Sequence, residues 1–137
     1  MISVMSTTDR YTLQPSLLEM HRQSLEWLSN SVLWKRELTF FQKLLEEHSK
    51  KFESLDDKKQ IDHFQNLIIY YQGELIDTFR KKLRDHENHL AKVLQDHNEA
   101  DSKYLQTHES VIQELTSFNQ QFQDFKHSFF EFIEKAL

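Results

Sequence analysis

The sequence predicts an all-α fold, an elongated antiparallel three-helix bundle with coiled-coil-like seams. The 137 residues include one glycine, one proline and no cysteine, whereas strand-rich folds need many turns that draw on glycine and proline. Apolar residues also recur at alternating steps of three and four, as on the buried face of a helix. We expect helices at about residues 15–53, 57–96 and 99–136, and their short connections make neighbours antiparallel.

The first expected helix follows a flexible N-terminal arm of residues 1–14, which is rich in serine and threonine and lacks apolar periodicity. Pro15 marks its start, because proline is tolerated in the first turn of a helix. Its seam consists of Leu17, Met20, Ser24, Trp27, Ser31, Trp34, Leu38, Phe41, Leu45, His48, Phe52 and Leu55. A seam of this length predicts a helix that spans the whole domain.

The second expected helix begins after Ser54, whose side chain is a suitable N-cap with Asp57 three residues on. Its seam consists of Ile61, Phe64, Ile68, Tyr71, Leu75, Phe79, Leu83, His86, Leu90, Val93 and His97. Steps of four follow one another between Ile68 and Leu83, which indicates a stutter in the seam. Gly73 lies in this stretch. We interpret it as making room for aromatic rings; a mid-bundle pocket for an apolar ligand is the alternative.

The third expected helix has the most regular seam. Asn98 is a suitable N-cap, with Asp101 at the third position after it. The seam steps by four and three without a fault through Tyr104, His108, Val111, Leu115, Phe118, Phe122, Phe125, Phe129, Phe132 and Ala136. With both turns placed, residues of the first two helices are level when their numbers sum to about 111, and those of the last two at about 197.

Composition excludes several classes of function. The net charge is −5, whereas nucleic-acid binders concentrate positive charge; the basic run at residues 80–84 is interpreted as a solvated helix face. The chain contains no apolar run long enough to span a membrane and no secretory signal, so a cytoplasmic protein is expected. It also lacks a glycine-rich phosphate loop and a catalytic motif. We therefore expect no enzyme activity and no cofactor.

Four histidines form a candidate metal site. The register places His21, His86, His89 and His108 near one end of the rod, with Glu87 and Glu109 in reach. Imidazole suits Zn, Cu, Ni or Fe, so a metal or small-ligand site is one hypothesis. However, His89 comes one residue too early after His86 for the H-E-x-x-H zinc motif. The favoured interpretation is that His86 and His108 fill the seam, while His21 and His89 lie at the surface.

Apolar residues outnumber the positions of a single seam. Leu18, Leu25, Leu28 and Val32 form a stripe beside the first seam, to which Leu33, Phe40 and Leu44 add, and Phe130 projects away from the third seam. A three-helix core takes up part of this surplus, and exposed apolar patches are typical of interfaces. The leading hypothesis is a non-enzymatic interaction or scaffold module, either a homo-oligomer or an adaptor for a partner helix. The expected contact residues are Leu25, Val32, Phe40 and Phe130.

Two segments, WKRELTFF at residues 34–41 and DHFQN at residues 62–66, resemble parts of small, uncharacterised helical proteins from bacteria. The resemblance covers the first two expected helices. It implies a bacterial, cytoplasmic helical protein and carries no activity with it.

Overall fold

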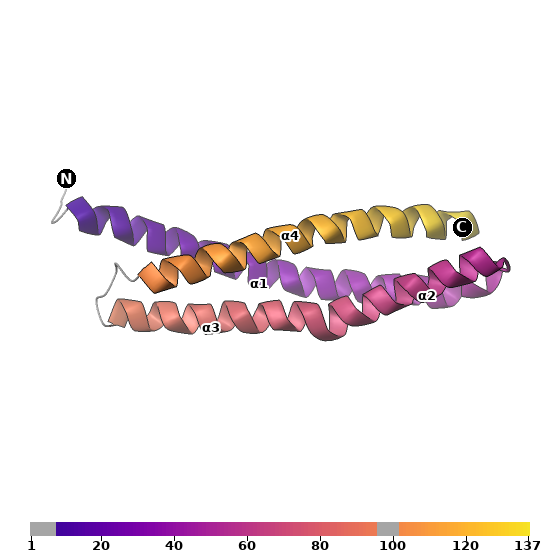
Figure 1. Cartoon of the computed structure of the whole chain (residues 1–137), viewed down its shortest axis with the longest axis horizontal. Coiled ribbons are helices and arrows are strands. Elements are labelled where there is room, and N and C mark those ends of the chain that lie inside the picture. Colours follow the sequence, from indigo (N-terminus) through magenta and orange to yellow (C-terminus); the bar gives the residue numbers. More distant parts are fainter. Residues whose placement is uncertain (1–7, 96–101) are drawn as a thin grey trace.

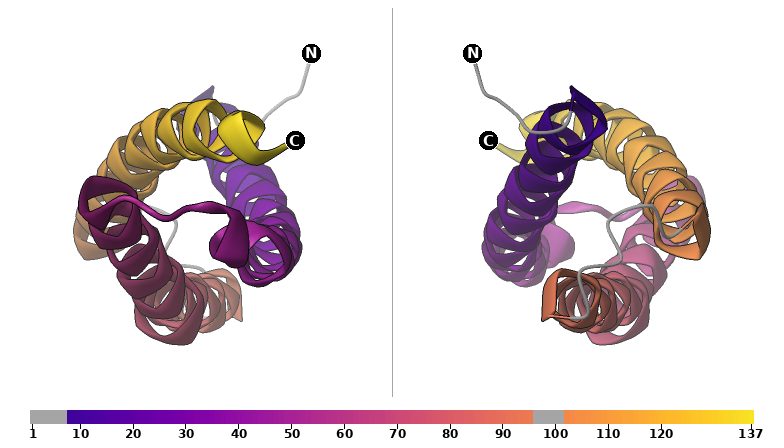
Figure 2. Two further views of the ribbon diagram at one scale, coloured as in Figure 1. Left: turned by 90° about the vertical axis from the view of Figure 1, so that its right-hand side faces the viewer. Right: turned by 90° about the vertical axis from the view of Figure 1, so that its left-hand side faces the viewer.

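The computed structural model describes the backbone of residues 8–95 and 102–137, and the side chains of residues 17–93 and 103–137. Within these residues the chain is all-α, with three long helices along a slender rod (Figure 1). They are α1 (Thr8–His48), then α2 (Leu55–Tyr70) continued by the π-helical segment η2 (Tyr71–Leu75) and α3 (Ile76–Gln95), and finally α4 (Ser102–Ile133). Viewed along the rod, the helices surround a common axis (Figure 2). The predicted three-helix bundle is confirmed.

Contacts between the helices agree with the predicted register to within a turn. Gln72 Nε2 donates to Thr39 Oγ1 at 2.6 Å, and these residue numbers sum to 111. Lys82 Nζ lies 2.7 Å from Glu114 Oε1, and these numbers sum to 196. The second helix therefore runs antiparallel to both α1 and α4, which are parallel to each other.

The start of α1 differs from the prediction. The helix begins at Thr8, so residues 8–14 of the predicted flexible arm are helical; the remainder of the arm lies outside the described residues. Pro15 does not mark the start of the helix: although proline lacks the amide hydrogen that interior helical residues donate, α1 continues through it. Residues 96–101 also lie outside the described part, and with them the predicted cap Asn98 and the seam residue His97.

The turn between α1 and α2 is built as predicted, with a shift of a few residues. Ser54 caps α2 by accepting a hydrogen bond from the backbone N–H of Asp57 at 3.1 Å. The helix α1 ends at His48 and is followed by the short 3-10 segment η1 (Ser49–Lys51). Leu55, expected to close the first seam, is exposed because it begins the next helix instead.

Aromatic rings on α4 fill the larger part of the core. Each α4 seam residue from Tyr104 to Phe132 is buried. Trp34 packs edge-on against Phe118 with ring centroids 4.9 Å apart. The ring centroids of Phe41 and Phe129 are 5.0 Å apart. Such tilted and edge-to-face pairs stabilise a core beyond the area that they bury. The regular seam of the third helix therefore contributes more buried aromatic rings to the core than either of the other helices.

The predicted stutter appears as the π-helical segment η2. A π turn contains one more residue than an α turn, so the seam steps by five from Tyr71 to Ile76. Ile76 is fully buried, whereas Leu75, the predicted seam residue, is only partly buried. The prediction failed at this position because both residues are apolar. The second helix changes direction here (Figure 1).

Gly73 does not make room for aromatic rings. It is exposed, and an added Cβ would meet no atom within 4 Å. The interpretation of Gly73 as a packing residue was therefore wrong, because the π turn directs this position to the solvent. Gly73 also does not border the core, so it does not open a path by which an apolar ligand could enter the core.

Replacing Gly73 with alanine is expected to stabilise the protein by about 0.5–1 kcal/mol. Alanine loses less backbone entropy on folding, and no neighbour obstructs its methyl group. Urea unfolding followed by circular dichroism measures the change. Glu74→Ala, at the adjacent exposed position, is the control and should change stability by less than about 0.5 kcal/mol. A destabilised Gly73→Ala variant would contradict the assignment.

Candidate functional site

The core of the rod is divided into two apolar clusters by a polar layer. The large cluster holds the phenylalanines, and the small one consists of Leu17, Leu90, Val93 and Tyr104, with Met20 packed against it. Between them lie the buried side chains of Ser24 on α1, His86 on α3 and His108 on α4. We call these three residues, together with Gln23, the histidine layer.

A chain of hydrogen bonds runs through the histidine layer. His108 Nε2 lies 2.8 Å from Gln23 Oε1, and His86 Nε2 lies 2.8 Å from His108 Nδ1. Since the amide oxygen of Gln23 accepts, Nε2 of His108 carries the hydrogen, and Nδ1 of a neutral His108 then accepts from His86. His86 Nδ1 is left as a buried acceptor that has no hydrogen-bond partner within the described residues.

Burial keeps both His86 and His108 neutral. Desolvation, together with repulsion from the nearby His108 and His89, lowers the pKa of His86 to about 4. Desolvation also lowers the pKa of His108, which the charge of Glu87 partly opposes. At neutral pH the layer therefore carries no positive charge on either ring.

The other two candidate ligands lie at the edge of the layer. His21 Nδ1 bonds to Glu87 Oε2 between α1 and α3, while the second oxygen of Glu87 is buried without a hydrogen-bond partner in the described part of the chain. His89 packs beside Tyr104, with ring centroids 5.4 Å apart. The ring of Tyr104 also lies 4.2 Å from that of His86, so the tyrosine separates the two histidines of α3 from the end of the rod.

The structure brings the four histidines to one end, as the register predicted, but not around a common point. His86 and His108 bond to each other, and His21 bonds to Glu87. Among the described side chains, those of residues 17–93 and 103–137, no group of three or more histidine or acidic residues is arranged to hold a metal ion. The burial of His86 and His108 agrees with the interpretation of these residues as seam fillers.

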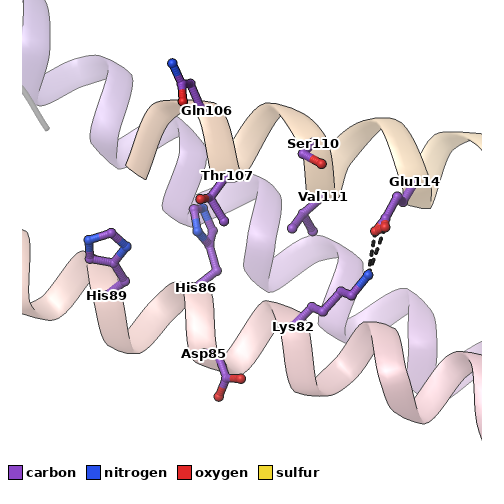
Figure 3. Close-up of a pocket in the computed structure, with 9 residues that line it drawn as sticks. All are labelled: Lys82, Asp85, His86, His89, Gln106, Thr107, Ser110, Val111 and Glu114. Carbon is purple, nitrogen blue, oxygen red and sulfur yellow. Dashed lines mark hydrogen bonds and ion pairs between the residues drawn. The ribbon is translucent and has the colours of Figure 1, made fainter. Parts of the chain in front are cut away.

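A polar groove lies beside the layer, on the surface between α3 and α4 (Figure 3). Its volume is about 590 Å³, and one part of it is crossed by the ion pair of Lys82 and Glu114 at 2.7 Å. The lining residues are Lys82, Asp85, His86, His89, Gln106, Thr107, Ser110, Val111 and Glu114. The groove is open to solvent. Because Lys82 and Asp85 already form ion pairs, their charges do not favour a ligand of either sign.

Buried Ser31, one heptad after Ser24, has hydrogen-bond partners, whereas the hydroxyl of Ser24 has none among the described residues. Its hydroxyl donates to the carbonyl of Leu28 at 2.6 Å and accepts from Arg80 Nη1 at 2.5 Å. Arg80 belongs to the basic run, whose Lys81 and Lys82 pair with Asp85 and Glu114. These bonds agree with the interpretation of the run as part of the helix surface rather than an anion site.

The expected contact residues are exposed. The exposed fractions are 49% for Leu25, 44% for Val32, 53% for Phe40 and 39% for Phe130. Leu18 and Leu33 are also exposed, whereas Leu28 and Leu44 pack against the core. We call Leu18, Leu25, Val32, Leu33 and Phe40 the apolar band of α1. Phe130 lies on α4, where its ring meets that of Phe41 edge-on at 5.4 Å.

Sequence reasoning missed the polar partners within the core. Gln23 flanks the seam, and nothing in its spacing signals that its amide orients His108. Ser24 and Ser31 were placed on the seam without a role, although two small polar residues in an apolar seam are the signal of a buried polar layer. The pairing of His21 with Glu87 follows from the register, which placed that glutamate in reach.

Comparison with known proteins gives no match. No family model fits the chain, and no curated protein or solved structure is significantly similar to it. The resemblance to small bacterial helical proteins stays a prediction. No described helix is both long and apolar enough to cross a membrane.

The two buried serines are expected to respond in opposite ways to substitution by alanine. Ser24→Ala removes a buried hydroxyl that has no partner among the described residues and should stabilise the protein by about 1 kcal/mol. Ser31→Ala leaves Arg80 without this acceptor and should destabilise it by about 1 kcal/mol. Urea unfolding of both variants measures the difference, to which helix propensity contributes equally. Equal effects of the two substitutions would show that the hydroxyl partners are misassigned.

Proposed function

We propose that the chain is a non-enzymatic interaction or scaffold module that self-associates through the apolar band of α1. The observation that carries the proposal is the exposure of five large apolar side chains on one helix. Exposed apolar surface that is contiguous on a soluble protein is typical of contact sites. Burying one such side chain completely stabilises a contact by roughly 1.5–3 kcal/mol. A side chain that is already half buried has about half of its area left to bury, so it contributes about half of this free energy.

The apolar band faces away from the rest of the bundle. Lys35 pairs with Asp77 of the second helix at 2.5 Å, and Glu37 pairs with Lys126 of α4 at 3.0 Å. These two residues mark the flanks of α1 that face its neighbours, so the side that carries Arg36 between them faces outward. The seven-residue spacing of Leu25 and Val32, and of Leu33 and Phe40, continues that outer side along the helix.

At two positions α1 departs from the pattern that the stability of a monomer favours. Ser24 and Ser31 are fully buried in the seam, while their immediate neighbours Leu25 and Val32 are exposed. A sequence shaped by the core alone would place the apolar residues inward and the serines outward. This inversion supports a role for the outer residues in contact with another molecule, and a second copy of the chain presents a matching surface.

Sedimentation equilibrium of the purified chain tests the proposal. We expect the wild type to associate between micromolar and high micromolar concentrations, and Val32→Glu/Leu33→Glu to weaken association at least tenfold. The doubly substituted Gln106→Glu/Gln113→Glu variant adds the same charge at exposed positions of α4 and should associate like the wild type. Thermal unfolding of each variant shows that the bundle is retained.

A wild type that stays monomeric at high micromolar concentration would contradict self-association. Equal weakening by the control variant would show that net charge, and not the apolar band, governs assembly.

A further inference from the structure

We propose that the histidine layer is a pH-sensitive switch: protonation of His86 at Nδ1 opens the end of the rod that carries the layer, while the phenylalanine-rich half stays folded. The proposal is independent of self-association, because it concerns the interior of one chain. It rests on the hydrogen-bond chain, on the division of the core and on the groups that surround the two rings.

The direction of the hydrogen bonds identifies the atom that takes up the proton. When both rings are neutral, Nε2 of each ring donates and Nδ1 of His108 accepts, which leaves Nδ1 of His86 as an acceptor without a partner among the described residues. A proton on this nitrogen makes His86 a buried cation without an acceptor at Nδ1. A buried charge that is not paired destabilises the folded state strongly.

Among the described residues, the titratable groups that face the pair give Nδ1 of His86 no acceptor, although the charge of Glu87 favours a proton on His108. They are His21 on α1, Lys82, Asp85, Glu87 and His89 on α3, and Tyr104 and Glu114 on α4. Glu87 already bonds to His21, and Glu114 pairs with Lys82. Asp85 pairs with Lys81 at the surface. The rings of His86 and His108 are in direct contact, so a second proton on His108 would add repulsion.

The apolar cluster beyond the layer is small. In the described residues it has four buried members, against nineteen in the phenylalanine-rich cluster. Regions with few buried apolar contacts open at a lower free energy than the rest of a fold. A penalty at the histidine layer therefore separates α1, α3 and α4 at this end first.

The sign of the pH dependence follows from the lowered pKa values. Between the ordinary histidine pKa and the folded-state value of about 4 for His86, the opened end binds more protons than the closed end. Closure is therefore most stable above about pH 6.5 and weakens as the pH falls toward 4. His86 alone shifts the opening equilibrium on the order of 100-fold over this range.

Amide hydrogen exchange followed by NMR between pH 7 and pH 4.5 tests the switch on the full chain. After correction for intrinsic exchange, protection of residues 86–93 and 104–108 should fall at least tenfold more than that of residues 64–70 and 118–129. In His86→Leu/His108→Leu the two halves should respond alike to pH. The control His63→Gln/His127→Gln, at two exposed positions, should keep the wild-type response.

Two results would overturn the proposal: equal loss of protection in both halves of the wild type, or a wild-type response in the leucine variant. Direct titration of the histidine ring nitrogens by NMR keeps the test independent of that variant's folding. We expect the pKa of His86 to lie well below the ordinary histidine value. Titration of His86 near pH 6.5 with the end still protected would contradict the switch.

Discussion

The packing of the α4 phenylalanines against the other two helices is the contact on which the rest of the structure depends. Phe118, Phe122, Phe125 and Phe129 lie on one seam, and each meets a ring of α1 or of the second helix. Their large buried area stabilises one half of the rod. This half can therefore accommodate a π turn in the second helix and an exposed glycine without loss of the fold.

The opposite end of the rod has a different interior. Small and polar side chains replace rings at the levels of Ser24, His86 and His108, and a hydrogen-bond chain takes the place of apolar packing. Buried polar groups that are satisfied fix one arrangement, whereas unsatisfied ones lower stability. Among the described residues the layer contains both kinds: the two bonded histidines, and the hydroxyl of Ser24 and Nδ1 of His86, which have no hydrogen-bond partner.

Periodicity was sufficient to predict the fold and the meeting of the histidines, because both depend on backbone geometry. Helical spacing and two short turns fix which residues are level, and this register predicts His86 and His108 near the same end of the rod. The predictions that failed depend on a choice between similar residues, and the contacts that were missed depend on side-chain geometry. Leu75 and Ile76 are equally apolar, so only the π turn decides between them. The orientation of Gln23 and the tautomers of the two histidines leave no trace in spacing.

The buried serines and the exposed leucines of α1 belong to one pattern. At residues 24–25 and 31–32 a serine faces the core and a large apolar side chain faces the solvent. At these two levels α1 therefore exposes apolar area that it could otherwise bury in the core. A chain whose local choices all served its own core would not show this conflict. The conflict falls on the same stretch of α1 that borders the histidine layer. The polar interior and the apolar exterior are thus two sides of a single segment of α1.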